Sequence, residues 1–271
     1  MTFFNHREPI LRRKQTHLDI QDLKGLIFWQ WTINKTPIFS LLYTRIDQVF
    51  LLWGWIVGII FLTPHVFPTF AWTHQALLGS GLSVLGIVGM VVFAWFWVKV
   101  ERLSWLIYLW TGLVLVGLGL TNYGIFAGVG GILVSVCSLW LGLCGLGYGL
   151  MGLGLRSRTF LIVGGLHLVS IPLLSVAPSY QFLLTAAVMA GSLFLLAEVQ
   201  WDMRPPLAAP VLSAEQIAFN QSQHRRRTED LSGASQICKF VDLMDNWPVM
   251  PVQTVIYREP LLPGGFPPPR E

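Results

Sequence analysis

Charged side chains are scarce in this sequence and are missing from three long stretches. Only 12% of the 271 residues are Asp, Glu, Lys or Arg, whereas 54% are hydrophobic; charged residues make up about 25% of a typical soluble protein. None occurs in residues 48–98, 103–155 or 159–197. This distribution excludes an ordinary soluble domain and predicts an integral membrane protein.

The sequence also lacks the motifs and buried acids that membrane enzymes and coupled transporters need. It contains no HExxH zinc motif, no GxSxG nucleophile elbow and no phosphate-binding loop. Between Asp47 and Glu198 the only carboxylate is Glu101, in a predicted loop. An intramembrane aspartyl protease and a proton- or sodium-coupled transporter both use acidic groups inside the bundle, so neither is favoured. We therefore predict that the chain is not an enzyme.

Cysteine is equally sparse, with three residues in the chain. Cys137 and Cys144 are seven residues apart on one predicted helix, a separation of about 10 Å that is too long for a disulfide. Cys238 lies on the side of the membrane predicted to be reducing. Neither a disulfide nor redox chemistry is expected.

Each uncharged stretch is long enough for two transmembrane helices and a turn, because one crossing of about 30 Å needs roughly 20 apolar residues. Turn-forming residues divide the stretches at Pro64 and Pro68, at residues 121–124 and at residues 177–179. The predicted helices cover about 47–63, 76–98, 104–120, 126–154, 159–175 and 180–197. The expected fold class is all-α, a polytopic membrane protein with six transmembrane helices in three hairpins over residues 47–198.

The lysines and arginines indicate how this bundle is oriented. Of the 18, seven precede the first helix, seven follow the last, and the others are Lys99, Arg102, Arg156 and Arg158 in two loops on the same side. Positively charged loops remain on the cytoplasmic side during insertion. Both termini are therefore expected to be cytoplasmic or stromal (N-in/C-in), in a bacterial inner membrane or a thylakoid membrane.

Residues 1–46 form a basic, interfacial segment suited to anionic membrane lipid. Within it Trp29, Trp31 and Ile33 alternate with polar residues, a pattern that indicates either a strand or interfacial aromatic anchors. Residues 37–45 are expected to lead into the first helix along the membrane surface.

Residues 199–271 form a proline-rich cytoplasmic tail that is expected to be mostly extended, with short ordered islands. These islands are a helix beginning at Ser213, a second helix at about 236–245 and a strand within 252–257. An apolar cluster in the tail predicts a protein-binding arm; the alternative is that the tail folds back on the protein's own cytoplasmic loops. The candidate partner-binding residues are Phe240, Trp247, Val252 and Tyr257.

Glycine is abundant, with 26 residues, and small residues let membrane helices approach one another closely. Gly54 and Gly58 form a GxxxG pair, and the fourth predicted helix is rich in glycine. Three roles for these glycines are consistent with the sequence: packing inside the bundle, packing against a partner, and making room for a flat ring or a lipid chain. The candidate helix-packing residues are Gly54, Gly58, Gly128, Gly142, Gly145 and Gly149.

His167 is the only ionisable side chain expected in mid-membrane, where such residues are usually functional. It is either a neutral histidine bonded within the bundle, a ligand of chlorophyll or haem, or a proton carrier. A haem with two axial ligands would need a second histidine in mid-membrane. His65 and His74 cannot supply it, because both are predicted at the membrane surface opposite to the basic loops. His65 and His74 could also bind a metal ion together, but no acidic residue or cysteine is predicted on that side to complete the site. No metal site is therefore expected.

Several functions remain after these exclusions. The first is a non-catalytic accessory or assembly subunit that docks on a larger membrane protein complex through glycine-rich helices and cytoplasmic termini. The alternatives are a pigment or haem carrier that uses His167, and a passive carrier or lipid-handling protein with a polar route near His167, Ser170 and Asn122. Membrane lipid, as partner or bound ligand, is expected in each case and nucleic acid in none.

Overall fold

The computed structural model describes residues 3–4, 9–14, 17–33, 36–205, 209–234 and 255–256. The chain is mostly helical, and six of its helices are long and apolar enough to cross a membrane. The prediction of a polytopic helical protein is confirmed at this level. Two compact units are present: unit 1 comprises Met1–Lys14 and Asp47–Pro205, and unit 2 comprises Gln15–Ile46 and Pro206–Glu271.

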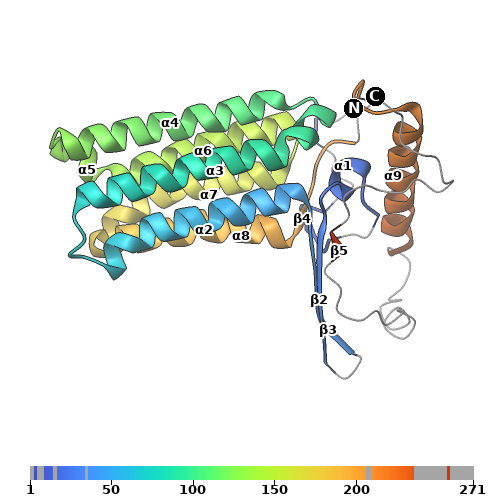
Figure 1. Ribbon diagram of the computed structural model, residues 1–271, viewed down its shortest axis with the longest axis horizontal. Coiled ribbons are helices and arrows are strands. Elements are labelled where there is room, and N and C mark those ends of the chain that lie inside the picture. The colour runs from blue at the N-terminus through green and yellow to red at the C-terminus, as the bar shows by residue number, and fades with distance from the viewer. Residues whose placement is uncertain are drawn as a thin grey trace. The chain divides into compact units, whose positions relative to one another are not determined.

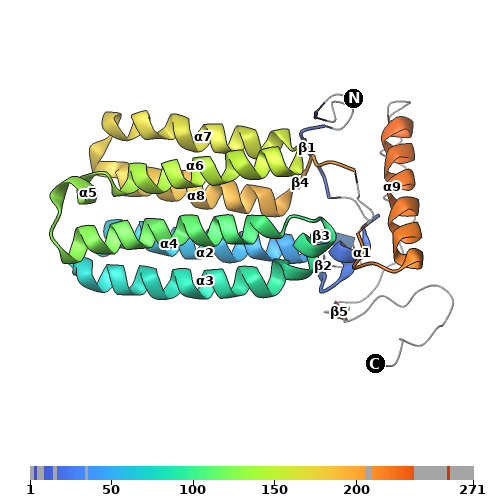
Figure 2. The same ribbon diagram turned by 90° about the horizontal axis from the view of Figure 1, so that it is seen from above.

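Unit 1 contains a bundle of six long helices that lie side by side (Figures 1 and 2). They are α2 (Arg45–Val66), α3 (Trp72–Val100), α4 (Ser104–Phe126), α6 (Val136–Leu155), α7 (Arg158–Val176) and α8 (Gln181–Glu198). A short helix, α5 (Gly130–Val134), precedes α6, and a 3-10 turn, η1 (Pro178–Tyr180), precedes α8. Strands β1 (Leu11–Arg12) and β4 (Gln200–Trp201) pair antiparallel beside the bundle.

One predicted turn is wrong, because residues 121–124 are helical and belong to α4. The side chains of Thr121 and Asn122 are bonded to neighbouring helices, so these polar residues do not need to leave the helix. The chain turns at residues 127–129 instead, where Gly128 has φ +65°, a left-handed conformation that glycine adopts without strain. Pro64, also expected in a turn, lies inside the last turn of α2.

Close contacts at glycine connect the helices of the bundle. An ideal Cβ atom on Gly54 would lie 2.7 Å from Phe194 of α8, and one on Gly86 of α3 would lie 2.9 Å from Trp53 of α2. Helix α2 therefore packs between α3 and α8. The other neighbouring pairs are α3 with α4, α4 with α6, α6 with α7 and with α8, and α7 with α8.

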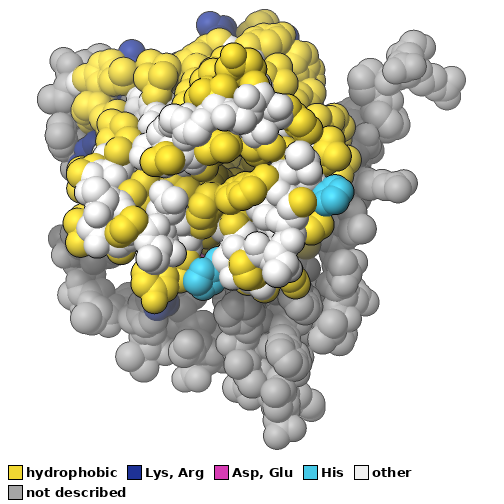
Figure 3. Space-filling view, turned by 90° about the vertical axis from the view of Figure 1, so that its left-hand side faces the viewer, with side chains coloured by type: hydrophobic (Ala, Val, Ile, Leu, Met, Phe, Trp, Pro, Cys, Tyr) yellow, Lys and Arg dark blue, Asp and Glu magenta, His cyan; other side chains and the backbone are white. Residues whose placement is uncertain are grey.

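The two ends of the bundle differ in charge. The basic end carries Lys99, Arg102, Arg156 and Arg158, in or next to the turns after α3 and α6. The α5 end comprises α5, residues 67–71 and residues 177–180, and has no Asp, Glu, Lys or Arg. Figure 3 shows mainly hydrophobic side chains over this end, with histidine and white atoms of other side chains and backbone among them, and no acidic group in view.

Unit 2 contains a β-hairpin of β2 (Ile27–Ile33) and β3 (Thr36–Tyr43). The alternation around Trp29 and Trp31 therefore belongs to a strand. Residues 37–43, expected as an interfacial lead-in, are also in a strand, because they pair with residues 27–32 across the hairpin. Strand β5 (Val255–Ile256) pairs with β2, within the range predicted for a strand.

Helix α9 (Ala214–Ala234) is the second main element of unit 2. It begins after Ser213, as predicted, with a capping box in which the Gln216 N–H donates to Ser213 Oγ at 3.3 Å and the Ser213 N–H donates to Gln216 Oε1 at 3.0 Å. It extends much further than a short island. The second predicted helix, at 236–245, lies outside the described residues.

Helix α9 contacts the amino-terminal segment around α1 (Ile20–Leu23). Asn220 Oδ1 accepts a hydrogen bond from the backbone N–H of Ile20 at 2.9 Å, and Arg227 Nη2 lies 2.9 Å from Asp19 Oδ2. Burial raises the pKa of Asp19, outweighing the opposing effect of Arg227. The described part of the tail thus folds back on the amino-terminal segment.

Candidate functional site

The bundle contains a partly open cavity of about 310 Å³ lined by α2, α3, α4, α5, α6 and α8. Its lining includes Pro64, Trp72, Leu133 and Phe182, which lie at or near the α5 end. It extends inward to the level of Ser83, which is 11 residues after the start of α3. At 1.5 Å per residue this is about 16 Å, or roughly half of a 30 Å hydrocarbon layer.

One wall of the cavity carries uncharged polar groups from α3, α4 and α6. Asn122 Nδ2 donates a hydrogen bond to Ser80 Oγ at 2.9 Å, which connects α4 to α3. Trp140 Nε1 donates to Thr121 Oγ1 at 3.1 Å, which connects α6 to α4. Ser83 also lines the cavity and is only 2% exposed, and no hydrogen bond joins its hydroxyl to any residue that the structure describes.

The remaining walls are largely apolar and come mainly from α2 and α8. Val57, Ile60 and Phe61 line the cavity from α2, and Phe182 and Met189 line it from α8. None of the lining residues is Asp, Glu, Lys, Arg or His. Such a cavity can bind an apolar chain or ring, but it offers no counter-ion for a charged group.

His167 does not line this cavity, because α7 contributes no residue to it. The imidazole is completely buried, Nδ1 lies 2.8 Å from the Val163 carbonyl oxygen, and the ring centroid is 5.1 Å from that of Tyr148 on α6. Nε2 has no hydrogen-bond partner among the described residues. The ring is therefore enclosed by protein, with one nitrogen left over, and ligation of haem or chlorophyll by His167 stays a prediction.

Of the three residues of the predicted polar route, only Asn122 lines the cavity. Ser170 is 2% exposed and donates a hydrogen bond to the Leu166 carbonyl oxygen within α7, whereas Asn122 lies in the cavity wall. At the α5 end, the ring centroid of His65 is 6.3 Å from that of Tyr180, and the His74 ring stacks on Phe70. No group of three or more metal-binding side chains occurs in the described ranges of the chain.

The predicted packing glycines divide into three groups. Gly54, Gly58 and Gly145 face other helices: a Cβ on Gly58 would lie 3.8 Å from Ala190, and one on Gly145 would lie 2.7 Å from Leu168. Gly142 and Gly149 sit at the edge of the α6–α7 contact. Gly128 instead forms the turn after α4, and a Cβ atom there would contact nothing within 4 Å.

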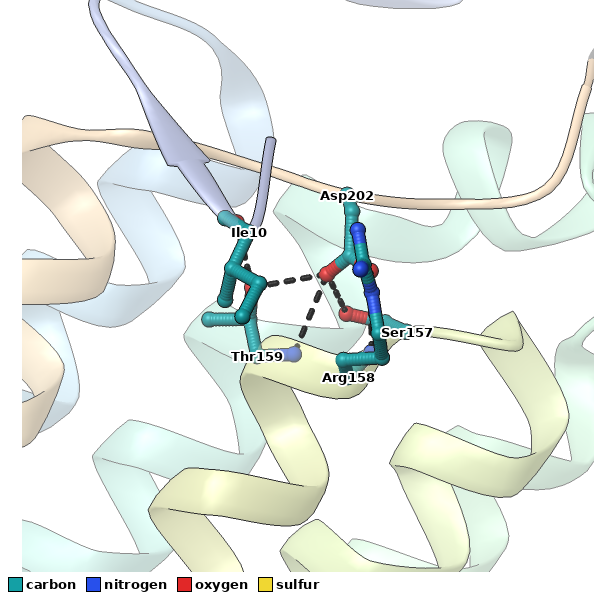
Figure 4. Close-up of polar contacts among 5 residues, drawn as sticks. All are labelled: Ile10, Ser157, Arg158, Thr159 and Asp202. Carbon is teal, nitrogen blue, oxygen red and sulfur yellow. Dashed lines mark hydrogen bonds and ion pairs between the residues drawn. The ribbon is translucent and has the colours of Figure 1, made fainter. Parts of the chain in front are cut away.

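A second polar cluster, absent from the sequence prediction, lies at the basic end around Asp202 (Figure 4). Asp202 is 1% exposed. Its carboxylate accepts hydrogen bonds from the backbone N–H groups of Arg158 and Thr159, both at 3.0 Å, and from Ser157 Oγ and Arg158 Nε, both at 2.9 Å. Thr159 Oγ1 lies 2.7 Å from the carboxylate and 2.7 Å from the Ile10 carbonyl oxygen. Asp202 thus caps the amino terminus of α7.

The electrostatics of this cluster favour the ionised carboxylate. Burial alone would raise the pKa of Asp202, but hydrogen bonds from Arg158 and Thr159 outweigh it and hold that pKa below its usual value. Arg204, two residues later, donates to the Glu101 carbonyl oxygen. Residues 202–204 therefore connect the turn after α3 to the start of α7, which is a structural role.

Sequence reasoning missed the cavity because its lining comes from five long helices and one short one, whose facing sides are not marked by a motif. The only available signal was the presence of Ser80, Ser83, Thr121 and Asn122 in otherwise apolar helices. The predicted partner-binding residues Phe240, Trp247, Val252 and Tyr257 lie outside the described residues.

No protein-family model, curated protein or solved structure matches this chain.

Proposed function

We propose that this protein is a membrane-embedded binding protein that holds a lipid-like molecule in the cavity of its bundle, in a lipid-handling or passive carrier role. The cavity of about 310 Å³ carries the proposal. Its volume falls at the lower end of the range for ligand sites, roughly 300 to 1,000 Å³. Protein interiors otherwise contain few voids larger than a water molecule.

The character of the walls supports a lipid-like occupant over water. A volume of 310 Å³ corresponds to about ten waters at their liquid density. Most of the wall around them consists of Val57, Ile60, Phe61 and similar apolar side chains, and covering apolar surface with an apolar chain instead of water is favourable. An acyl or isoprenoid chain would fill this part of the cavity.

We further propose that the helices form three hairpins and that both termini are cytoplasmic or stromal, in a bacterial inner membrane or a thylakoid membrane. The support is the concentration of Lys99, Arg102, Arg156 and Arg158 at one end of the bundle and the lack of charge at the other. In this orientation the cavity lies near the opposite membrane surface.

Filling the cavity tests the binding role. Gly79 lines the cavity, and a phenylalanine there would occupy part of its volume. Gly81 on the same helix faces open space, because a Cβ atom on it would contact nothing within 4 Å, so Gly81→Phe is the matched control. Both variants are purified in a mild detergent, and the molecules that co-purify are identified by native mass spectrometry.

We expect an apolar molecule to co-purify with the wild type and with Gly81→Phe, and its occupancy to fall at least tenfold in Gly79→Phe. Equal occupancy in both variants, or no co-purifying apolar molecule in any of them, would contradict the cavity as a binding site.

A second role, as an accessory or assembly subunit of a larger membrane complex, is favoured by a separate observation. Gly112 and Gly119 on α4, Gly165 on α7 and Gly191 on α8 pack against no side chain, because a Cβ atom on each would contact nothing within 4 Å. Glycine costs about 1 kcal/mol relative to alanine inside a helix. An intermolecular helix contact would explain why small residues occupy these faces.

The docking role has its own test. Gly119→Leu would enlarge the outer face of α4 without entering the bundle, and Leu120→Val on the same helix serves as a control that changes volume only slightly. Blue-native electrophoresis of the native membrane should show a smaller complex for Gly119→Leu than for the control. A complex of unchanged size would contradict docking through α4.

A further inference from the structure

We infer that the cavity selects an uncharged amphiphile that bears a hydroxyl or carbonyl oxygen, and that Ser83 and Asn122 bind this oxygen. The inference rests on the proposed binding function and adds the chemical class of the ligand. It excludes both a fatty acid anion and a plain hydrocarbon as the preferred occupant.

The first observation is the unused hydrogen-bonding capacity of the polar wall. Ser83 is 2% exposed, lines the cavity, and makes no hydrogen bond through its hydroxyl with the described residues. Leaving a buried hydroxyl without a partner is unfavourable, and a ligand oxygen beside it would satisfy it. Asn122 donates one amide N–H to Ser80 Oγ, and its Oδ1 lies 3.4 Å from the same hydroxyl. A second N–H and one acceptor position of the amide remain for a ligand.

The second observation is that the neighbouring polar groups hold this wall in place. Thr121 is next to Asn122 in the sequence and accepts the hydrogen bond from the Trp140 indole. The Asn122–Ser80 bond and the Trp140–Thr121 bond together connect three helices beside the cavity. Ser80 and Ser83 are three residues apart on α3 and so share one face of that helix.

The third observation is the absence of charge among the lining residues. The lining has no Lys, Arg or His to pair with a carboxylate or phosphate, and no Asp or Glu to pair with an amine. An ion held inside hydrocarbon without a partner is strongly disfavoured. An alcohol, ester or quinone carbonyl is neutral and can use the hydroxyl and amide groups that are present.

The test compares three photoreactive probes that share one twelve-carbon chain with a diazirine near its end. One probe carries a terminal hydroxyl, one a carboxylate that is ionised at pH 8, and one no polar group. Full-length protein in detergent micelles is labelled with each probe over a range of concentrations. Mass spectrometry of peptides then quantifies labelling of the α2 and α8 residues that line the cavity.

We expect the alcohol to label the cavity at a concentration at least threefold lower than the hydrocarbon or the carboxylate. Ser83→Ala should weaken alcohol labelling by about 3- to 10-fold, the range for one uncharged hydrogen bond, and leave hydrocarbon labelling unchanged. Asn122→Leu should weaken alcohol labelling at least as much, because it also removes the bond to Ser80. Ser175→Ala is the control, because Ser175 is exposed on α7 and does not line the cavity.

The outcomes separate the inference from the function on which it rests. Equal labelling by alcohol and hydrocarbon that neither variant changes would overturn the inference and leave the binding function standing. Preference for the carboxylate would also overturn it. Labelling of the cavity by none of the three probes would contradict the binding function itself. Circular dichroism of each variant checks that it is folded before labelling.

Discussion

Replacing Asp202 tests whether one carboxylate holds the basic end of the bundle together. Asp202→Ala removes the acceptor for both backbone N–H groups at the start of α7, for Ser157 Oγ and for the Arg158 guanidinium. Thr159 is 3% exposed and Ser157 is completely buried. Water therefore cannot easily replace the lost hydrogen bonds.

The expected loss follows from these contacts. Removing a helix cap costs about 1 kcal/mol, with a range of roughly 0.5 to 2, and each hydrogen bond to a charged group is worth about 1.5 to 3 kcal/mol. The Arg158 side chain is 20% exposed, so its charge is partly solvated after the change and its pair adds less than a fully buried one would. We expect Asp202→Ala to lower the free energy of unfolding by about 3 kcal/mol, or roughly 100-fold in the equilibrium constant. Asp202→Asn keeps an acceptor oxygen and should cost about 1 to 2 kcal/mol.

The measurement is unfolding by SDS in mixed micelles, followed by circular dichroism. Glu215→Gln is the control, because Glu215 is exposed on α9 and should change stability by less than about 0.5 kcal/mol. Because the folded-state pKa of Asp202 is lowered, its stabilisation is fully present above the unfolded pKa of about 3.9 and is lost as the pH falls through the folded pKa. The difference between wild type and Asp202→Asn should therefore shrink below about pH 4. A cost for Asp202→Ala no larger than that of the control would refute this account.

Three further predictions concern topology, packing and the buried histidine. In a background without native cysteines, Thr73→Cys should react with an impermeant thiol reagent added from outside. Ser222→Cys should react only after the membrane is opened. Labelling of Ser222→Cys but not Thr73→Cys in intact membranes would contradict the proposed orientation. Gly164→Leu should destabilise the bundle by about 1 to 3 kcal/mol in the same SDS assay, because a Cβ atom there would lie 2.9 Å from the Gly145 carbonyl oxygen. Gly165 faces open space, so Gly165→Leu should be tolerated. Equal effects of the two changes would contradict the close α6–α7 contact. His167→Phe removes the contact of Nδ1 with the Val163 carbonyl oxygen as well as Nε2, which has no partner among the described residues. These two effects on stability oppose each other, so the free energy of unfolding should change by less than about 1.5 kcal/mol; a larger loss together with loss of visible absorbance would support the pigment or haem alternative.

The sequence predicted the helices well because their cause is local. An uncharged stretch of sufficient length must satisfy its own backbone inside hydrocarbon, and a helix does this without any partner. The predicted end of the third helix failed at Thr121 and Asn122, where propensity favours a turn. Thr121 accepts a hydrogen bond from Trp140 and Asn122 donates one to Ser80, each on another helix, and no pattern within one helix reveals these bonds.

The sites were less predictable for the same reason. The cavity depends on which faces of α2, α3, α4, α6 and α8 point inward, and apolar residues surround each of these helices. Asp202 carried no sequence signal, because its cap acts on a helix that begins 44 residues earlier in the chain. By contrast, the start of α9 at Ser213 was predicted, and the two residues of its cap, Ser213 and Gln216, are only three positions apart.

The same long-range cap has a consequence for biosynthesis. Helix α7 leaves the ribosome before the residue that caps it, and 44 residues separate Arg158 from Asp202. At about 5 to 20 residues per second, translation supplies the carboxylate roughly two to nine seconds after the first turn of α7 has been made. During that interval the amide groups at this end must remain hydrated or be shielded by the insertion machinery. Closure of the bundle at its basic end is therefore a late event that waits for α8 to be complete.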